Sequence, residues 1–362
     1  MSSFYNIETS HTPIPYVLIG DFLKDLDDEH TLCGVAGLMT KGIIDLKCVV
    51  GNMCPQRLRA RGAKGTLKEL GFPDIPVGVG AHVCDVKIQS YEKDVPYLAR
   101  DDEVEEDGLD LILRTLEQCD DDSVVLVLQS ALTDAAMLID AHRDVFIRKV
   151  KQVAIMGGLE VSNEKIVLDS DGYAVPNNAN NNTFDMEAAR YVYREIQAMN
   201  KPLIVTTRDC AYQMKVPFKM YDELNKTGNV VGACLLNRQR PALQGLWEAA
   251  CDVEGGSKRG TLPIDRNRQW FINVFCGGKN LDHIEDGGNI WDCVDSFVLY
   301  DPVNLYASIP ELEERFLKPV RFGRDGRHKL FGLSAKNHGV KDVDGFASFL
   351  VEIEMNGLAL RN

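Results

Sequence analysis

The sequence lacks the features that mark several common classes of protein. Its ten cysteines show no Cys-x-x-Cys or other paired spacing, so neither a zinc site nor a disulfide framework is indicated. No apolar run approaches the ~20 residues that span a bilayer. The segment from Met1 to His11 is polar, without the apolar core of a signal peptide. We therefore expect a cytoplasmic protein whose cysteines are reduced and mostly buried.

Two motifs of nucleotide and ester chemistry are also missing. No Gly-x-Gly-x-x-Gly fingerprint follows the first predicted strand, which argues against dinucleotide redox chemistry. No Gly-x-Ser-x-Gly nucleophile elbow is present. Acidic residues outnumber basic ones, 54 to 40, so the formal net charge is −14. A chain this acidic is repelled by nucleic acids and by anionic membranes, so we expect neither as a partner.

What the chain does have is a large apolar fraction, 45%, arranged in a regular alternation. Strand-like runs occur at 16–19, 46–50, 75–79, 124–128, 153–156 and 203–206. Helical patterns lie between most of them, at 27–39, 56–70, 109–118, 133–148 and 184–199. This alternation predicts a single α/β domain over residues 12–362, with a mostly parallel, Rossmann-like open sheet and helices on both faces.

The second half of the chain is less regular. Residues 237–269 are polar and rich in arginine. They predict a lid or excursion over one end of the sheet, or else a plain surface loop. A further helix is predicted over about 289–299, ended by Asp301-Pro302, and a last helix over about 343–355.

Carboxylates are concentrated directly after the first predicted strand. Within eight residues stand Asp21, Asp25, Asp27 and Asp28. Like charges at this density repel one another, and the usual partner that holds them together is a divalent cation with oxygen ligands. The carboxyl ends of strands are also where ligands bind in open α/β sheets. The alternative is that Asp27 and Asp28 only complement the dipole of the following helix.

Four more segments fall at predicted strand ends or helix starts. They are Val50-Gly51-Asn52-Met53, Gln129 to Ala136, Met156-Gly157-Gly158, and the amide-rich run from Asn177 to Asp185. Each has a structural explanation by itself, because Asn caps helices and Gly permits turns. Since parallel strands carry their carboxyl ends to one edge of the sheet, we expect the four segments to line one site.

In this order the segments resemble the inosine-uridine-type nucleoside hydrolases, over about residues 16–302. The matching elements are the paired aspartates Asp27-Asp28, the Gly-Asn turn 51–52, Asp-Gly-Leu at 107–109, Leu-Thr at 132–133, Met-Gly-Gly at 156–158, Asn181, and the helix start at Asp185. Asp292 precedes Asp301-Pro302 by nine residues, the spacing of the family's last calcium-binding Asp to its own Asp-Pro. The altered Asp signature resembles a divergent branch that contains type III effectors of plant-pathogenic bacteria.

The resemblance implies a nucleoside hydrolase fold, a bound Ca²⁺, and hydrolysis of an N-ribosidic bond, as in purine and pyrimidine salvage. It also implies a homodimer or homotetramer. The calcium ligands it implies are Asp28, Asp292 and the Thr133 carbonyl. A carboxylate would accept the proton of the attacking water. The substrate contacts it implies are Asp27, Asn52, Met156, Asn180, Asn181 and Trp291.

Three positions depart from the family pattern. Leu23 stands where the signature has another Asp, so Asp21 or Asp25 replaces that ligand and base, or the function is lost. Ala179 stands where the family has a Glu that holds the ribose 5′-hydroxyl. Trp291 stands where a common subgroup has a His that protonates the leaving base. Trp cannot act as that acid; it either stacks on a base or packs against the protein.

The missing Glu makes a 5′-phosphorylated ribose acceptable. Cations that could pair with the phosphate are Arg238, Arg240, Lys258, Arg259, Arg266 and Arg268; the alternative is that they form a solvated surface. We therefore predict calcium-dependent hydrolysis of a nucleoside, a nucleotide or an ADP-ribose-like compound. The alternative function is a catalytically weak protein that binds a nucleotide or ADP-ribose in the same pocket.

Overall fold

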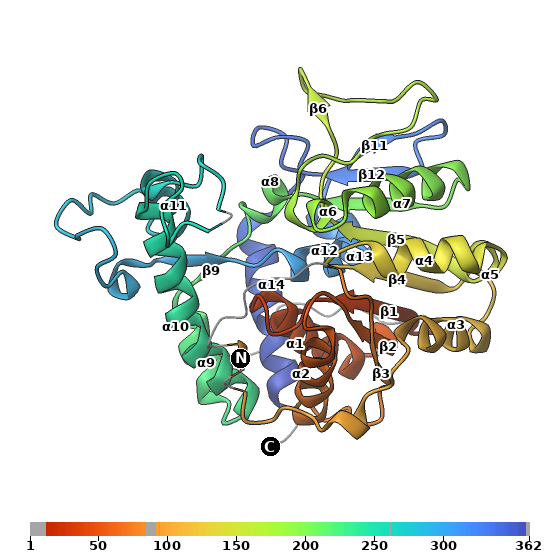
Figure 1. Cartoon of the computed structure of the whole chain (residues 1–362), viewed down its shortest axis with the longest axis horizontal. Coiled ribbons are helices and arrows are strands. Elements are labelled where there is room, and N and C mark those ends of the chain that lie inside the picture. Colours follow the sequence, from red (N-terminus) through yellow and green to blue (C-terminus); the bar gives the residue numbers. More distant parts are fainter. Residues whose placement is uncertain (1–11, 84–91, 94, 261, 360–362) are drawn as a thin grey trace.

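Eight strands form the central sheet, in the order β11-β12-β8-β5-β4-β1-β2-β3 (Figure 1). The computed structural model describes residues 12–359 except 84–91, 94 and 261; the polar N-terminal segment 1–11 lies outside the described residues. The neighbouring strands are parallel except β11 and β12, which are antiparallel. Along the chain, the strands of this sheet are β1 (Ile14–Gly20), β2 (Ile44–Gly51), β3 (Val77–Val79), β4 (Val124–Leu128), β5 (Val150–Met156), β8 (Leu203–Thr206), β11 (Val320–Phe322) and β12 (His328–Phe331).

Helices cover both faces of the sheet because each buried strand alternates its side chains. In β1, Tyr16 and Leu18 join the core of one face, whereas Val17 and Ile19 join the core of the other. The first face is covered by α1 (Asp27–Thr40), α2 (Gln56–Glu69), α12 (Asp301–Ala307), α13 (Pro310–Phe316) and α14 (Val343–Leu358). The second is covered by α3 (Gly108–Gln118), α4 (Thr133–Ala141), α5 (Arg143–Lys149) and α7 (Met186–Ala198). The predicted α/β fold class is therefore confirmed.

A helical extension stands beside the sheet, in green and teal in Figure 1. It contains α9 (Lys219–Lys226), α10 (Val230–Cys251) and α11 (Arg268–Phe275). The segment 237–269, predicted as a lid or loop, is helical up to Cys251. The arginine-rich composition of the segment did not indicate this helix. The helix is capped by Asn229, whose side chain accepts a hydrogen bond from Val231 N.

The predicted helix over 289–299 is wrong. That stretch contains a short 3₁₀ turn, η3 (Trp291–Cys293), and the strand β10 (Ser296–Val298), which pairs with β9 (Lys215–Pro217). Asp301-Pro302 begins α12 instead of ending a helix, because proline is well suited to the first helical turn.

Smaller elements complete the chain. The predicted helix 133–148 is divided at His142 into α4 and α5. Two short strands, β6 (Val161–Ser162) and β7 (Lys165–Ile166), form a hairpin, and α6 (Asn180–Thr183) and α8 (Arg208–Ala211) are single turns. Within the described ranges, no helix combines the length and apolar character needed to cross a bilayer.

Candidate active site

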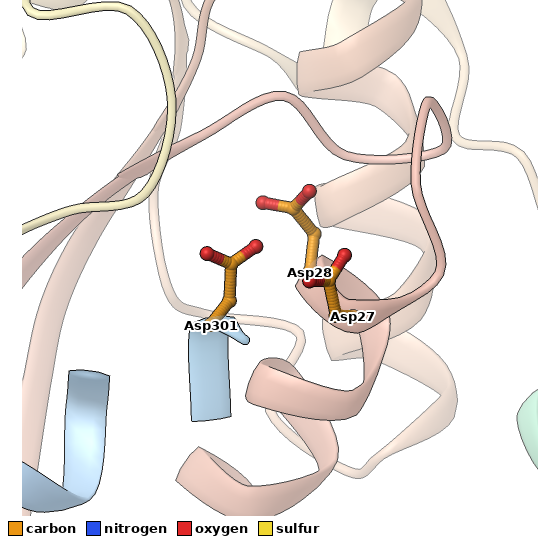
Figure 2. A group of neighbouring side chains, drawn as sticks. All are labelled: Asp27, Asp28 and Asp301. Carbon is orange, nitrogen blue, oxygen red and sulfur yellow. The ribbon is translucent and has the colours of Figure 1, made fainter. Parts of the chain in front are cut away.

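Three carboxylates meet at the amino ends of two helices. Asp27 and Asp28 lie in the first turn of α1, and Asp301 is the first residue of α12. One carboxylate oxygen from each lies within 4.8 Å of the others, and Figure 2 shows Asp301 facing the pair from the neighbouring helix. The free N–H groups at helix amino ends favour negative charge there. We call Asp27, Asp28 and Asp301 the acidic group.

The acidic group is largely shielded from water. Asp28 is fully buried and Asp301 is 4% exposed, while Asp27 is half-buried. Neither carboxylate oxygen of Asp28 has a hydrogen-bond partner among the described residues. A Cβ atom at Gly20 would overlap Asp28 Oδ1, so the glycine leaves room for this carboxylate. Because an ionised carboxylate without a partner is costly to bury, the residues fit a hard cation with oxygen ligands.

Burial and mutual repulsion raise the pKa of each member of the acidic group. Burial is the largest cause for all three, and neighbouring carboxylates add to it. The pKa values of Asp28 and Asp301 are well above the ordinary range for a carboxyl. The pKa of Asp27 is raised to about 7, with Asp25 and Asp21 as the main charged neighbours. A bound divalent cation would reverse these shifts.

The two carboxylates offered as replacements for the missing signature Asp differ in position. Asp21 is 3% exposed, and its charge contributes to the raised pKa values of Asp28 and Asp301. The Asp25 side chain is 61% exposed. Lys24 lies between them, with its Nζ 3.0 Å from Asp21 Oδ2 and 2.7 Å from Asp25 Oδ2. Asp21 is therefore the buried candidate and Asp25 the exposed one, while both charges act on the acidic group.

Leu23, at the position of the missing Asp, turns away from the acidic group. Its side chain is fully buried in an apolar cluster with Val95 and Cys234. Its backbone has a φ of 70°, a conformation that residues other than glycine rarely adopt. Leu23 N donates a hydrogen bond of 2.7 Å to Glu29 Oε1.

Asp292 does not join the acidic group. It is exposed in η3, and Asp301, nine residues later, is the aspartate that the fold brings to Asp27 and Asp28. The sequence does indicate that Asp301 begins a helix, because an Asp-Pro pair after a strand is typical of a helix start. Trp291 packs against the protein: its ring lies 4.8 Å from that of Phe218, and the Arg240 guanidinium lies 5.1 Å from it.

The amide of Asn52 is engaged within the fold. Asn52 is fully buried, and its Nδ2 donates to Ala131 O and to Asp134 Oδ2, at 2.9 and 2.7 Å. Ser130 donates its hydroxyl to Asn52 Oδ1. Both N–H groups of this amide are thus used to join the chain after β2 to the chain after β4, and its oxygen already accepts one hydrogen bond.

The remaining predicted residues lie along the same edge of the sheet. Asn181 donates hydrogen bonds of 3.0 Å to the carbonyls of Gln129 and Met156, which end β4 and β5. The Thr133 hydroxyl donates to Asp185 Oδ2 at 2.7 Å. Asn180 is exposed and Met156 is buried.

A row of contacts between one arginine and two tyrosines connects the α10–α11 loop with the acidic group. Tyr300 directly precedes Asp301, and its ring meets that of Tyr212 edge-on at 6.0 Å. Arg266 donates a hydrogen bond to the Tyr212 hydroxyl, and its guanidinium lies 5.0 Å from the Trp270 ring. Burial raises the pKa of Tyr300 well above its usual value, and the Asp27 charge contributes. Neither tyrosine stands in a sequence motif that predicts a site.

The other five predicted cations have partners inside the protein. Arg238 donates to Leu23 O, and Arg240 stacks on Trp291. Lys258 pairs with Glu248, Arg259 donates to the carbonyls of Asp252 and Pro263, and Arg268 donates to those of Leu281 and Ile284. Of the six, Arg266 is the one connected to the acidic group through the tyrosines.

The chain resembles known proteins in its three-dimensional structure. The sequence matches no family model and no curated protein. The structure is similar to that of the type III effector XopQ complexed with adenosine diphosphate ribose, with 27% identity and a TM-score of 0.77 over 97% of this chain and 94% of that one. It is also similar to the effector protein XOO4466, with 26% identity and a TM-score of 0.79 over 97% and 95% of the two chains.

An enzyme of known class has the same architecture. The purine-preferring ribonucleoside hydrolase from Gardnerella vaginalis is 15% identical, with a TM-score of 0.60 over 96% of this chain and 100% of that one. The chain has the nucleoside hydrolase fold. Its neighbours are both hydrolases and effectors, so the resemblance to a divergent branch is confirmed. The nucleoside hydrolase fold does not by itself establish an activity, which depends on the site.

Proposed function

We propose that this protein binds Ca²⁺ and hydrolyses the N-glycosidic bond of a ribonucleoside or a 5′-phosphorylated ribonucleoside, releasing the base and ribose or ribose phosphate. The acidic group is the observation that carries this proposal. Asp28 has two buried carboxylate oxygens without partners among the described residues, beside Asp27 and Asp301. The likeness to a ribonucleoside hydrolase supports the reaction class.

The residues that hold the ion are Asp28, Asp301 and Asp21, with the carbonyl of Thr133. A bound calcium ion supplies a template for the ribose hydroxyls and a more acidic water. Asp27 accepts the proton of the attacking water, because it is the most exposed member of the acidic group and lies beside the residues that hold the ion. The water attacks C1′, and the bond to the base nitrogen breaks through an oxocarbenium-like transition state, as in glycoside hydrolysis.

The preferred ligand carries phosphate on its ribose. Ala179 is half-buried and has no charge to repel a phosphate. Arg266 offers a guanidinium, the group best suited to bidentate phosphate binding. The complex of the effector XopQ with adenosine diphosphate ribose supports a ligand of this class. The Tyr300 hydroxyl is protonated at neutral pH, as that of any tyrosine with an ordinary or raised pKa is, and it offers the ligand a hydrogen-bond donor.

One observation favours the alternative function. Leu23 replaces the signature aspartate, and its side chain lies in an apolar cluster, outside the acidic group. If neither Asp27 nor Asp21 replaces the missing base, the protein is a binding protein for a nucleotide or ADP-ribose. For either function we expect a homodimer or homotetramer in the cytoplasm.

The experiment is chromatographic detection of free base from a panel of ribosides, with calcium and with chelator. The panel contains purine and pyrimidine nucleosides, their 5′-monophosphates, NAD and ADP-ribose. Calcium-dependent release that is lost in Asp28→Asn supports the hydrolase. Absence of release, with ADP-ribose still bound in calorimetry, supports the binding protein and contradicts the hydrolase.

A further inference from the structure

The acidic loop after β1 contains a cation of its own. Lys24 Nζ lies 3.0 Å from Asp21 Oδ2 and 2.7 Å from Asp25 Oδ2. It also lies 4.9 Å from the centroid of the Phe184 ring, whose face attracts positive charge. The Lys24 side chain is only 19% exposed. This ammonium is therefore held at one place by two carboxylates and an aromatic ring.

Asp21 connects Lys24 to the acidic group. The Asp21 side chain is 4% exposed, and it is among the carboxylates that repel Asp28 and Asp301. Lys24 therefore neutralises the charge of Asp21 on one side of the acidic group. On the other side, the two carboxylate oxygens of Asp28 are buried without partners among the described residues. An ammonium is a compact point charge, and it repels a second cation bound a few ångströms away.

We propose that Lys24 is a built-in counter-ion that competes with a divalent cation for Asp21, and that it weakens the binding of that cation to the acidic group. This inference rests on the calcium site of the proposed function. For as long as the Lys24 ammonium stays on Asp21, the ion has Asp28, Asp301 and the Thr133 carbonyl as ligands but not Asp21. Lys24 also preserves the fold of the loop when no ion is bound, because Asp21 and Asp25 keep a positive partner.

The test is calcium binding to the full-length protein by isothermal titration calorimetry. Lys24→Met removes the ammonium and keeps a long apolar chain next to Phe184. We expect it to bind calcium at least tenfold more tightly than the wild type. Lys24→Arg keeps the charge and is expected to bind as the wild type does. Lys47→Met is the matched control for net charge, because Lys47 is an exposed lysine paired with Asp45.

Each outcome is decisive. Equal affinities of the wild type and Lys24→Met overturn the inference while leaving the calcium site in place. Binding by Lys24→Met alone supports the counter-ion and contradicts calcium-dependent function in the wild type. Absence of binding by both proteins overturns both. Circular dichroism checks the fold, and Lys24→Gln replaces Lys24→Met if the latter does not fold.

Discussion

Arg238 on α10 donates a hydrogen bond of 2.8 Å to the backbone carbonyl of Leu23, 215 positions earlier in the chain. Glu29 on α1 accepts a hydrogen bond from the amide of the same residue. Both charged side chains are almost completely buried. The turn between Asp21 and Asp25, with its uncommon backbone conformation at Leu23, is thus held from two helices.

Arg238→Met is expected to destabilise the protein by about 3–5 kcal/mol, because it leaves Glu29 buried without its positive neighbour. Burial already raises the pKa of Glu29, and Arg238 opposes that shift. The free energy of unfolding in urea measures the effect. Arg240→Met, an exposed position on the same helix, is the control and should change stability by less than about 1 kcal/mol. Equal stability of the two variants would contradict this role.

Asp28→Asn and Asp301→Asn are each expected to stabilise the ion-free protein by roughly 1–3 kcal/mol, because each buried carboxyl must either carry a charge repelled by its neighbours or take up a proton on folding, and an amide needs neither. They should also abolish the stabilisation that calcium gives to the wild type. Thermal denaturation in calcium and in chelator measures both effects. Asp292→Asn is the control, since Asp292 is exposed; if it alone abolished the calcium effect, the assignment of Asp301 would be wrong.

The stability of the ion-free protein should fall as the pH rises from about 4 to about 7. The pKa of Asp27 is raised from 3.8 to about 7 in the folded state, so the folded protein binds this proton more tightly than the unfolded chain does. Stability from that proton is fully present below the unfolded pKa and is lost as the pH passes through the folded pKa.

Calcium should reverse this trend, because binding an ion to carboxylates displaces their protons. The gain in melting temperature from calcium is therefore expected to increase between about pH 4 and about pH 7. Melting temperatures across this range, with calcium and with chelator, test both trends. Asp27→Asn should make the profile in chelator less steep, and the raised pKa values of Asp28 and Asp301 should keep part of the slope. A wild-type profile in chelator that is already flat would contradict the raised pKa of Asp27.

Arg266→Gln is expected to weaken binding of ADP-ribose by roughly tenfold to a hundredfold, the range for one charge-assisted hydrogen bond. The affinity for adenosine, which has no phosphate, should change little. Calorimetry with both ligands gives the ratio. Arg268→Gln is the matched control, because Arg268 donates to Leu281 and Ile284 carbonyls and stacks on Trp247. An unchanged ratio in Arg266→Gln would remove the support for a phosphate site.

The sequence by itself determined most of the sheet, without β11 and β12, and two of the three carboxylates of the acidic group. Buried parallel strands need continuous apolar runs, so the pattern located β1, β2, β4, β5 and β8 to within a few residues. The positions of Asp27 and Asp28 could be predicted from the sequence for the same reason. They occupy the first turn of α1, which a short loop joins to the end of β1, so local patterning alone placed them near the carboxyl edge of the sheet.

Only the tertiary structure decided which charges meet there. Asp292 and Asp301 have similar local sequences of acid and apolar residues, but the pairing of β10 with β9 and the start of α12 bring Asp301 to Asp28 and leave Asp292 exposed. Asn52 matched a ligand contact, yet both its N–H groups and one lone pair of its oxygen are engaged by residues of the loop after β4 and of α4. Periodicity and capping depend on near neighbours in the chain, whereas the partners of a buried charge come from distant segments that meet only when the core packs.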